Sequence, residues 1–135
     1  MQILHPPGWA RPRGYSNGIS TEGGRLVFIA GQIGWNEQCV FTEKGFGGQF
    51  RQTLRNILAV LTQAGGRPEH IVRLTWYVVD RQEYLAAGAE VGAAYRELMG
   101  RHYPTMAVVQ VGALVEDAAR LEIEAMAVVP LDPAP

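Results

Sequence analysis

The stretch FRQTLRNILAVLTQAGGRPEHIVRLTWYVV, residues 50–79, decides the fold. In its first part apolar residues recur at intervals of three and four, which predicts an amphipathic helix. Gly65 and Gly66 then supply the residue type that commonly ends a helix, and Pro68 prevents the helix from continuing. Residues 71–79 are rich in β-branched and aromatic side chains and predict a strand. This succession predicts helices that pack on a sheet.

Further elements follow on both sides of this stretch. Residues 26–30 form a short apolar run bounded by glycines, which predicts a buried strand, and residues 16–20 could pair with it as a hairpin across residues 22–24. Apolar residues spaced three and four apart predict a second helix over 84–98, ended by Gly100. The last two predicted strands are 106–111 and 121–129.

The predicted order is therefore β-β-α-β-α-β-β. Two helices against one mixed sheet make an α+β two-layer sandwich. In the last strand, Leu121 and Ile123 point to one face, and Glu122, Glu124 and Met126 to the other. One face of the sheet takes the helices. The other carries Trp, Tyr and Met side chains, and in a small chain its cover is most easily another subunit.

Length and composition are those of one globular domain. The chain has 135 residues, of which 47% are hydrophobic and 19% charged, so we expect a single domain over residues 1–135. Residues 1–15 contain three prolines and predict an irregular N-terminal segment that forms no strand, and residues 130–135 predict a tail of similar kind.

Charge and cysteine content narrow the function classes. The 12 basic and 13 acidic residues give a net charge of -1, without the basic excess of a nucleic-acid-binding domain. No apolar run is long enough to span a membrane, and no targeting segment is visible. The one cysteine, Cys39, cannot form an internal disulfide, which favours a reducing compartment and a cytoplasmic protein. The three histidines lack metal-ligand spacing, so we expect no metal site.

Two carboxylates are the first candidates for chemistry. Glu122 and Glu124 lie two apart on a predicted strand and therefore point from the same face. One interpretation is a solvated face on which they pair with Arg120 or with a neighbouring strand. The other is a carboxylate at a cleft between subunits, placed to polarise a water molecule. Their spacing alone leaves both interpretations open.

Several short segments together match a known family. The chain resembles the Rid proteins, the reactive intermediate deaminases that are also called the YjgF-like or L-PSP endoribonuclease family. The matching pieces occur in order over nearly the whole chain: GYSN at 14–17, FIAGQI at 28–33, QFRQTL at 49–54 with Asn56–Ile57, AG at 64–65, VVD at 78–80, Pro104, and LEIEA at 121–125.

The resemblance implies a chorismate-mutase-like fold and a homotrimer with ligand clefts between subunits. It also implies hydrolysis of short-lived enamines and imines to a carbonyl product and ammonia, without a cofactor or metal. Carried over residue by residue, Glu122 is the catalytic residue that positions the attacking water, Tyr15 lines the cleft, and Gly31 contacts the ligand through its backbone.

One position departs from the pattern. Met106 stands where deaminating members have the arginine that grips a substrate carboxylate, and a thioether cannot replace such a two-pronged donor. We therefore expect an arginine-lacking branch, whose substrate is an enamine or imine other than 2-aminoacrylate. The alternative is a non-catalytic trimer that binds a small molecule in its clefts. A nuclease, which the family's older name suggests, is disfavoured by the net charge.

Two ways of holding the ligand remain open. Met106, Trp35 and Tyr15 could grip a larger and less charged ligand by apolar contact. Otherwise another cation enters the cleft, and the candidates near the other site residues are Arg13, Arg101 and His102.

Overall fold

The structure is a computed structural model that describes residues 1–131. Four strands form the main sheet in the order β3-β6-β4-β5. Their bounds are Arg25–Ile33 (β3), Ile71–Val78 (β4), Thr105–Gln110 (β5) and Leu121–Val129 (β6). β6 is antiparallel to both β3 and β4, whereas β4 and β5 run parallel. The sheet is mixed, as predicted.

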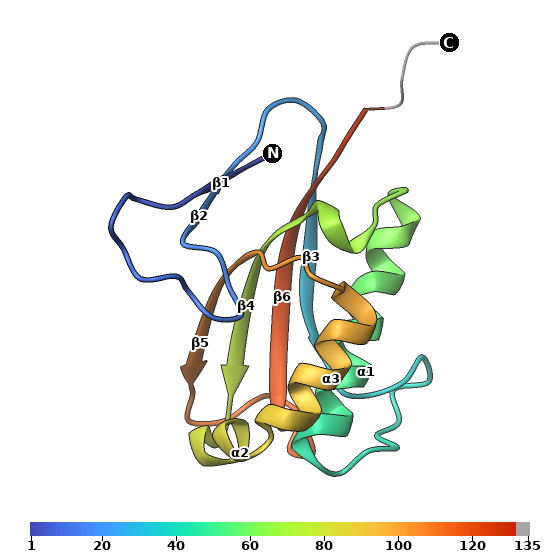
Figure 1. The fold of residues 1–135 in the computed structure, drawn as a ribbon. Coiled ribbons are helices and arrows are strands. Elements are labelled where there is room, and N and C mark those ends of the chain that lie inside the picture. Colours follow the sequence, from blue (N-terminus) through green and yellow to red (C-terminus); the bar gives the residue numbers. More distant parts are fainter. Residues whose placement is uncertain (132–135) are drawn as a thin grey trace.

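The helices follow the predicted pattern with shifted boundaries. α1 spans Phe46–Gln63, and the second predicted helix is divided into α2 (Arg81–Ala86) and α3 (Gly88–Met99). A short 3-10 turn, Pro68–His70, precedes β4. Gly65 and Gly100 have φ of 73° and 63° just beyond α1 and α3, which confirms them as stop residues. Figure 1 shows α1 and α3 on the same side of the sheet.

The core lies between these helices and one face of the sheet. Phe50, Leu54, Ile57 and Leu61 of α1 are fully buried, as the helical spacing predicts. In β6 burial alternates, with buried Leu121 and Ile123 toward the helices. Trp76 corrects the prediction that tryptophan covers the open face, because its ring is buried and stacks on Phe50 with centroids 4.9 Å apart. Its register opposite Ile123 places it on the helix-covered side.

The opposite face of the sheet has no covering element among residues 1–131. Register places twelve side chains on this open face: Leu26 and Phe28 from β3; Arg73, Thr75 and Tyr77 from β4; Thr105, Ala107 and Val109 from β5; and Glu122, Glu124, Met126 and Val128 from β6. Phe28 is 68% exposed. Half of these side chains are apolar, and a cover by another subunit remains a prediction.

The N-terminal segment differs from the prediction in two ways. Gln2–Leu4 forms a strand, β1, although residues 1–15 were expected to be irregular. Its partner is β2 (Gly18–Ser20), so the predicted hairpin between residues 16–20 and 26–30 is wrong. Leu4 lies opposite Gly18, where a Cβ would come within 3.2 Å of the leucine side chain. The small residue permits this close pairing. Residues 132–135 of the predicted tail lie outside the described residues.

No helix in the described part of the chain combines the length and the apolar character needed to cross a membrane.

Candidate functional site

Glu122 and Gly31 meet at one edge of the sheet. Glu122 is the second residue of β6 and is half-buried. Gly31 lies in β3, where the pairing with β6 is interrupted between Ile29 and Gln32. A Cβ at position 31 would lie 2.8 Å from the carboxyl carbon of Glu122, so the side chain rests directly over the glycine. The absence of a side chain at position 31 therefore makes room for the carboxylate.

The two neighbouring glutamates have different surroundings. Glu124 accepts a hydrogen bond of 2.7 Å from the Tyr77 hydroxyl on β4, so it pairs with a neighbouring strand. This hydrogen bond, followed by partial desolvation and the nearby negative charges of Glu124 and Glu122, raises the pKa of Tyr77. Glu122 forms no ion pair with any residue from 1 to 131, and Arg120 instead approaches Glu83 at 3.6 Å. Pairing with Arg120, the simplest structural role for Glu122, is therefore not observed.

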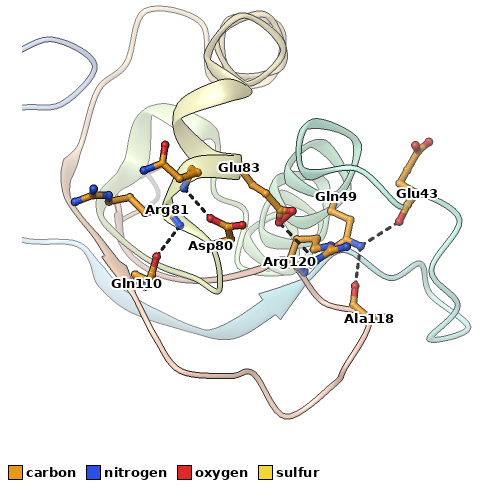
Figure 2. Close-up of polar contacts among 9 residues, drawn as sticks. Glu43, Gln49, Asp80, Arg81, Glu83, Gln110, Ala118 and Arg120 are labelled. Carbon is orange, nitrogen blue, oxygen red and sulfur yellow. Dashed lines mark hydrogen bonds and ion pairs between the residues drawn. The ribbon is translucent and has the colours of Figure 1, made fainter.

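A buried glutamine anchors the start of β6. Gln49 of α1 is 1% exposed. Its side-chain nitrogen donates to the carbonyl oxygens of Glu43 (3.1 Å) and Ala118 (2.9 Å), and its oxygen accepts from the Arg120 backbone at 2.8 Å. Figure 2 shows these bonds converging on one side chain. The strand that carries Glu122 thus begins at a fixed point.

The same helix also fixes the end of β3. A Cβ at Gly34 would lie 2.6 Å from the Cβ of Gln49, so helix and loop pack in direct contact. About two turns further along the helix, Asn56 donates to the carbonyl oxygens of Ile33 (3.0 Å) and Trp35 (2.8 Å). Trp35 lies in the loop after β3, with its ring 5.8 Å from that of Phe41. Gln49 and Asn56 were not predicted as functional residues, because only the fold shows that these polar side chains lie at buried or half-buried positions.

Tyr15 and Met106 lie at the opposite edge of the sheet. The Ser16 backbone donates to the carbonyl of Pro104 at 3.1 Å, which places Tyr15 beside the start of β5. Tyr15 is 42% exposed. Met106 pairs in register with Leu74 and packs against the core on the helix-covered side.

A single chain does not bring all the predicted site residues together. Glu122 lies opposite Tyr77, three residues beyond Leu74, the β4 partner of Met106. Two strand spacings and three residues separate Met106 from Glu122, which is about 10 Å in each direction. The two side chains also leave opposite faces. One chain therefore brings Gly31 and Glu122 together at the β3–β6 edge, whereas Tyr15 and Met106 lie apart from them on the β5 side of the sheet.

Within residues 1–131, no three His, Cys, Asp or Glu side chains gather into a group that could hold a metal ion. The cation candidate His102 is engaged in the fold, because its ring nitrogen lies 2.6 Å from the carbonyl oxygen of Ile71.

The family model described as Endoribonuclease L-PSP matches residues 10–129. The chain belongs to this family, which includes the Rid and YjgF proteins. Solved structures share the fold. The Rid family protein YyfB from Yersinia pestis superposes with a TM-score of 0.81 at 31% identity, covering 95% of this chain and 98% of that one. The YjgF product of Escherichia coli gives a TM-score of 0.66 at 32% identity, over 84% and 87% of the two chains.

Relatives of similar length are found among curated sequences. TdcF of Escherichia coli K12, whose name provisionally describes it as a reactive intermediate deaminase, is 32% identical over 131 residues, 95% of each chain. A RutC family protein of Haemophilus influenzae is 34% identical over 105 residues, 78% of this chain and 80% of the relative. The resemblance drawn from the short sequence motifs is thereby confirmed.

Proposed function

We propose that this Rid family protein is a hydrolytic deaminase of a reactive enamine or imine, with Glu122 as its catalytic residue. The observation that carries the proposal is the placement of the Glu122 carboxylate over Gly31, without an ion-pairing cation among residues 1–131. A half-buried carboxylate that no cation neutralises can act as a proton acceptor. The deaminase named among the relatives supports the same reaction class.

Hydrolysis of an enamine or imine requires the protein to position a water molecule and to transfer protons. An enamine first becomes an imine by proton transfer to carbon. Water then attacks the imine carbon and a C–O bond forms, while Glu122 accepts the proton that the water loses. The proton passes to nitrogen as the C=N π bond opens, which gives a carbinolamine. Glu122 then carries the hydroxyl proton of the carbinolamine to nitrogen, the C–N bond breaks, and the products are a carbonyl compound and ammonia. Because the imine carbon is already electrophilic, placing it beside a polarised water supplies most of the rate enhancement.

We propose further that the site is completed between copies of the chain in a homotrimer. The β3–β6 edge carries Gly31 and Glu122, and the β5 edge carries Tyr15 and Met106, so each edge offers what the other lacks. A contact between two different edges is head-to-tail, and such contacts form rings when the rotation closes. The apolar open face, including Phe28, would then be covered by neighbouring subunits.

The test compares Glu122→Gln with Glu124→Gln. Both changes remove one charge from the same face of β6, but only Glu122 lies over Gly31. Ammonia release is measured with a panel of imines generated in situ, and light scattering reports the mass of each protein. We expect trimeric wild-type protein to release ammonia, Glu122→Gln to lose about 100-fold or more of the rate, and Glu124→Gln to keep most of it. Equal rates in wild type and Glu122→Gln would contradict the catalytic role.

A second candidate function is a non-catalytic trimer that binds a small molecule. The observation that favours it is Met106, which packs toward the core and offers no charged group to a substrate. Saturable binding of a small ligand without ammonia release from any imine of the panel would support this alternative.

A further inference from the structure

The segment between β1 and β2 carries a local excess of positive charge. We call residues 5–17 the N-terminal arm. It contains Arg11, Arg13 and His5 and no acidic residue, although the whole chain has a net charge of -1. Arg11 forms no ion pair with any residue from 1 to 131. The arm therefore presents cationic groups that the described part of the chain does not neutralise.

Hydrogen bonds hold the arm in one conformation. The pairing of Leu4 with Gly18 closes it at its base. The two ring nitrogens of His5 lie 3.2 Å from the Asn17 side-chain nitrogen and 3.0 Å from the Trp9 carbonyl oxygen. Since an amide nitrogen donates and a carbonyl accepts, Nδ1 of His5 accepts and Nε2 donates, which uses both nitrogens within the arm. His5 is thus a structural bridge and leaves arginine as the available donor.

The arm is also fixed to the body of the domain. Ser16 donates from its hydroxyl to the carbonyl of Tyr103 at 2.5 Å and from its backbone to the carbonyl of Pro104. In Figure 1 the arm, in dark blue, lies on the β5 side of the sheet. The ring of Tyr103 in turn stacks on Tyr95 of α3, with centroids 5.3 Å apart. A surface built in this way is largely formed before a ligand arrives.

A small pocket lies between the arm and the body. Its volume is about 180 Å³, and its walls include Leu4, Arg11, Pro12, Tyr15 and Tyr103. A cavity of about 150 Å³ can hold a benzene molecule, so this one suits a ligand of four to six heavy atoms. The pocket is also lined by His5, Ser16 and Asn17, whose side chains already form hydrogen bonds within the protein. A mostly apolar and aromatic lining with one arginine that has no ion-pair partner within residues 1–131 matches a short aliphatic chain that ends in a carboxylate.

We propose that this pocket binds the carboxylate of a small aliphatic acid, with Arg11 as its donor. Tyr15 lines the pocket and was assigned to the cleft by sequence resemblance, so the pocket would hold the carboxylate end of the substrate or product. In that respect the inference rests on the proposed function. The donor is then none of the three cations left open by the sequence, because Arg13 and Arg101 do not line the pocket and His102 is bonded to Ile71.

The experiment compares butyrate with butyramide, which have the same shape and differ in charge. Binding of each probe is measured by NMR titration at low ionic strength on full-length wild type, Arg11→Gln and Arg13→Gln. The two arginines are both exposed and two residues apart on the arm, so Arg13→Gln controls for the loss of one positive charge. We expect wild type and Arg13→Gln to prefer butyrate over butyramide by about tenfold or more, and Arg11→Gln to lose this preference.

A third variant tests the geometry of the donor. Arg11→Lys keeps the charge but cannot form the two parallel bonds of a guanidinium, so we expect a preference between those of Arg11→Gln and wild type. Thermal unfolding and light scattering are used to check that each variant is folded and has the same mass as the wild type. Equal affinities of wild type for butyrate and butyramide would overturn the proposal, and so would equal losses in Arg11→Gln and Arg13→Gln.

Ammonia release tests the proposed function, and butyrate binding tests the pocket, so the two proposals can fail independently. Loss of charge-dependent butyrate binding in Arg11→Gln supports the pocket even if no imine is hydrolysed. Conversely, ammonia release that depends on Glu122 but not on Arg11, together with unchanged butyrate binding in Arg11→Gln, would retain the deaminase and overturn the pocket.

Discussion

A phenylalanine lies on each side of the central sheet, one from a helix and one from a strand, and the two have opposite surroundings. Phe50 of α1 is fully buried against the helix-covered face, where it stacks on Trp76. Phe28 of β3 is 68% exposed on the open face. The first face is complete within one chain, whereas the second leaves a large aromatic side chain in water. An exposed apolar surface of this kind is typical of a protein–protein contact.

The comparison separates what the chain does alone from what it needs partners to do. On the covered face, Gln49 accepts a hydrogen bond from the Arg120 backbone at the start of β6, and Asn56 donates one to the Ile33 carbonyl at the end of β3. On the open face, Arg73, Glu122 and Glu124 lie among apolar side chains and form no ion pair within residues 1–131. The contacts that stabilise the single chain therefore lie mainly on the helix-covered side of the sheet, whereas the open face is available to bind a partner. Substitutions can test this division.

The largest expected effect is on the covered face. Phe50→Ala removes a fully buried ring and leaves a cavity, so we expect the free energy of unfolding to fall by about 3–5 kcal/mol. Phe28→Ala removes an exposed ring and should cost the isolated chain no more than about 0.5 kcal/mol. Denaturant unfolding measures the first effect, and light scattering against concentration measures the second. We expect Phe28→Ala to weaken assembly while the chain stays folded.

Two results would break the comparison. If Phe28→Ala destabilises a protein that is monomeric throughout, the open face contributes to folding of the single chain. If Phe28→Ala leaves both stability and mass unchanged, Phe28 is no part of a subunit contact.

The next effect concerns the anchor of β6. Gln49→Ala leaves the Arg120 backbone N–H without its partner, along with two carbonyl groups. Because these three hydrogen bonds are partly buried and are lost together, we expect a loss of about 1–3 kcal/mol in unfolding free energy. Gln52 on the same helix forms one side-chain bond, to Asn56 at 2.9 Å, and Gln52→Ala should cost about 1 kcal/mol or less. Equal costs would show that Gln49 is no special anchor.

How well the sequence predicts each element of this fold depends on how far apart in the chain the interacting residues lie. Local signals suffice for α1 and β6, because helical spacing and strict alternation report which face is buried. They fail for β1, since three residues near two prolines carry no strand signal until Gly18–Ser20 lies beside them. Trp76 was misplaced for a similar reason. Its ring fills the space between Phe50 and Tyr84, and the sequence does not show that these residues meet.

The candidate site was predictable in part. Glu122 and Gly31 follow from motif resemblance, and the structure brings them into contact. Arg11 was missed because its position in the pocket depends on the arm closing through Leu4 and Gly18. The separation of Met106 from Glu122 also depends on strand order, which residue spacing does not contain.

A smaller effect distinguishes the two glutamates on the open face. The pKa of Tyr77 is raised above its ordinary value of 10.0, chiefly by the hydrogen bond to Glu124. We expect Glu124→Gln to lower the pKa of Tyr77 clearly and Glu122→Gln to lower it less, since Glu122 acts only through its charge. Because this pKa is higher in the folded state, the phenol stabilises the fold below about pH 10, and that contribution is lost as pH rises further. NMR of ring-labelled tyrosine measures the shift, and equal shifts in both variants would contradict the assignment.

The smallest effect is on the covered face again, at Thr53 of α1. This residue is fully buried, and its hydroxyl has no hydrogen-bond partner among the described residues. Thr53→Val keeps the shape and removes the unpaired group, so we expect the unfolding free energy to rise by up to about 1 kcal/mol. The control is Thr62 on the same helix, whose hydroxyl donates to the Leu58 carbonyl at 2.8 Å. Thr62→Val should be neutral or slightly destabilising. Thermal unfolding shows the difference as a few degrees of melting temperature, and a lower melting temperature for Thr53→Val would mean that its hydroxyl is paired in solution.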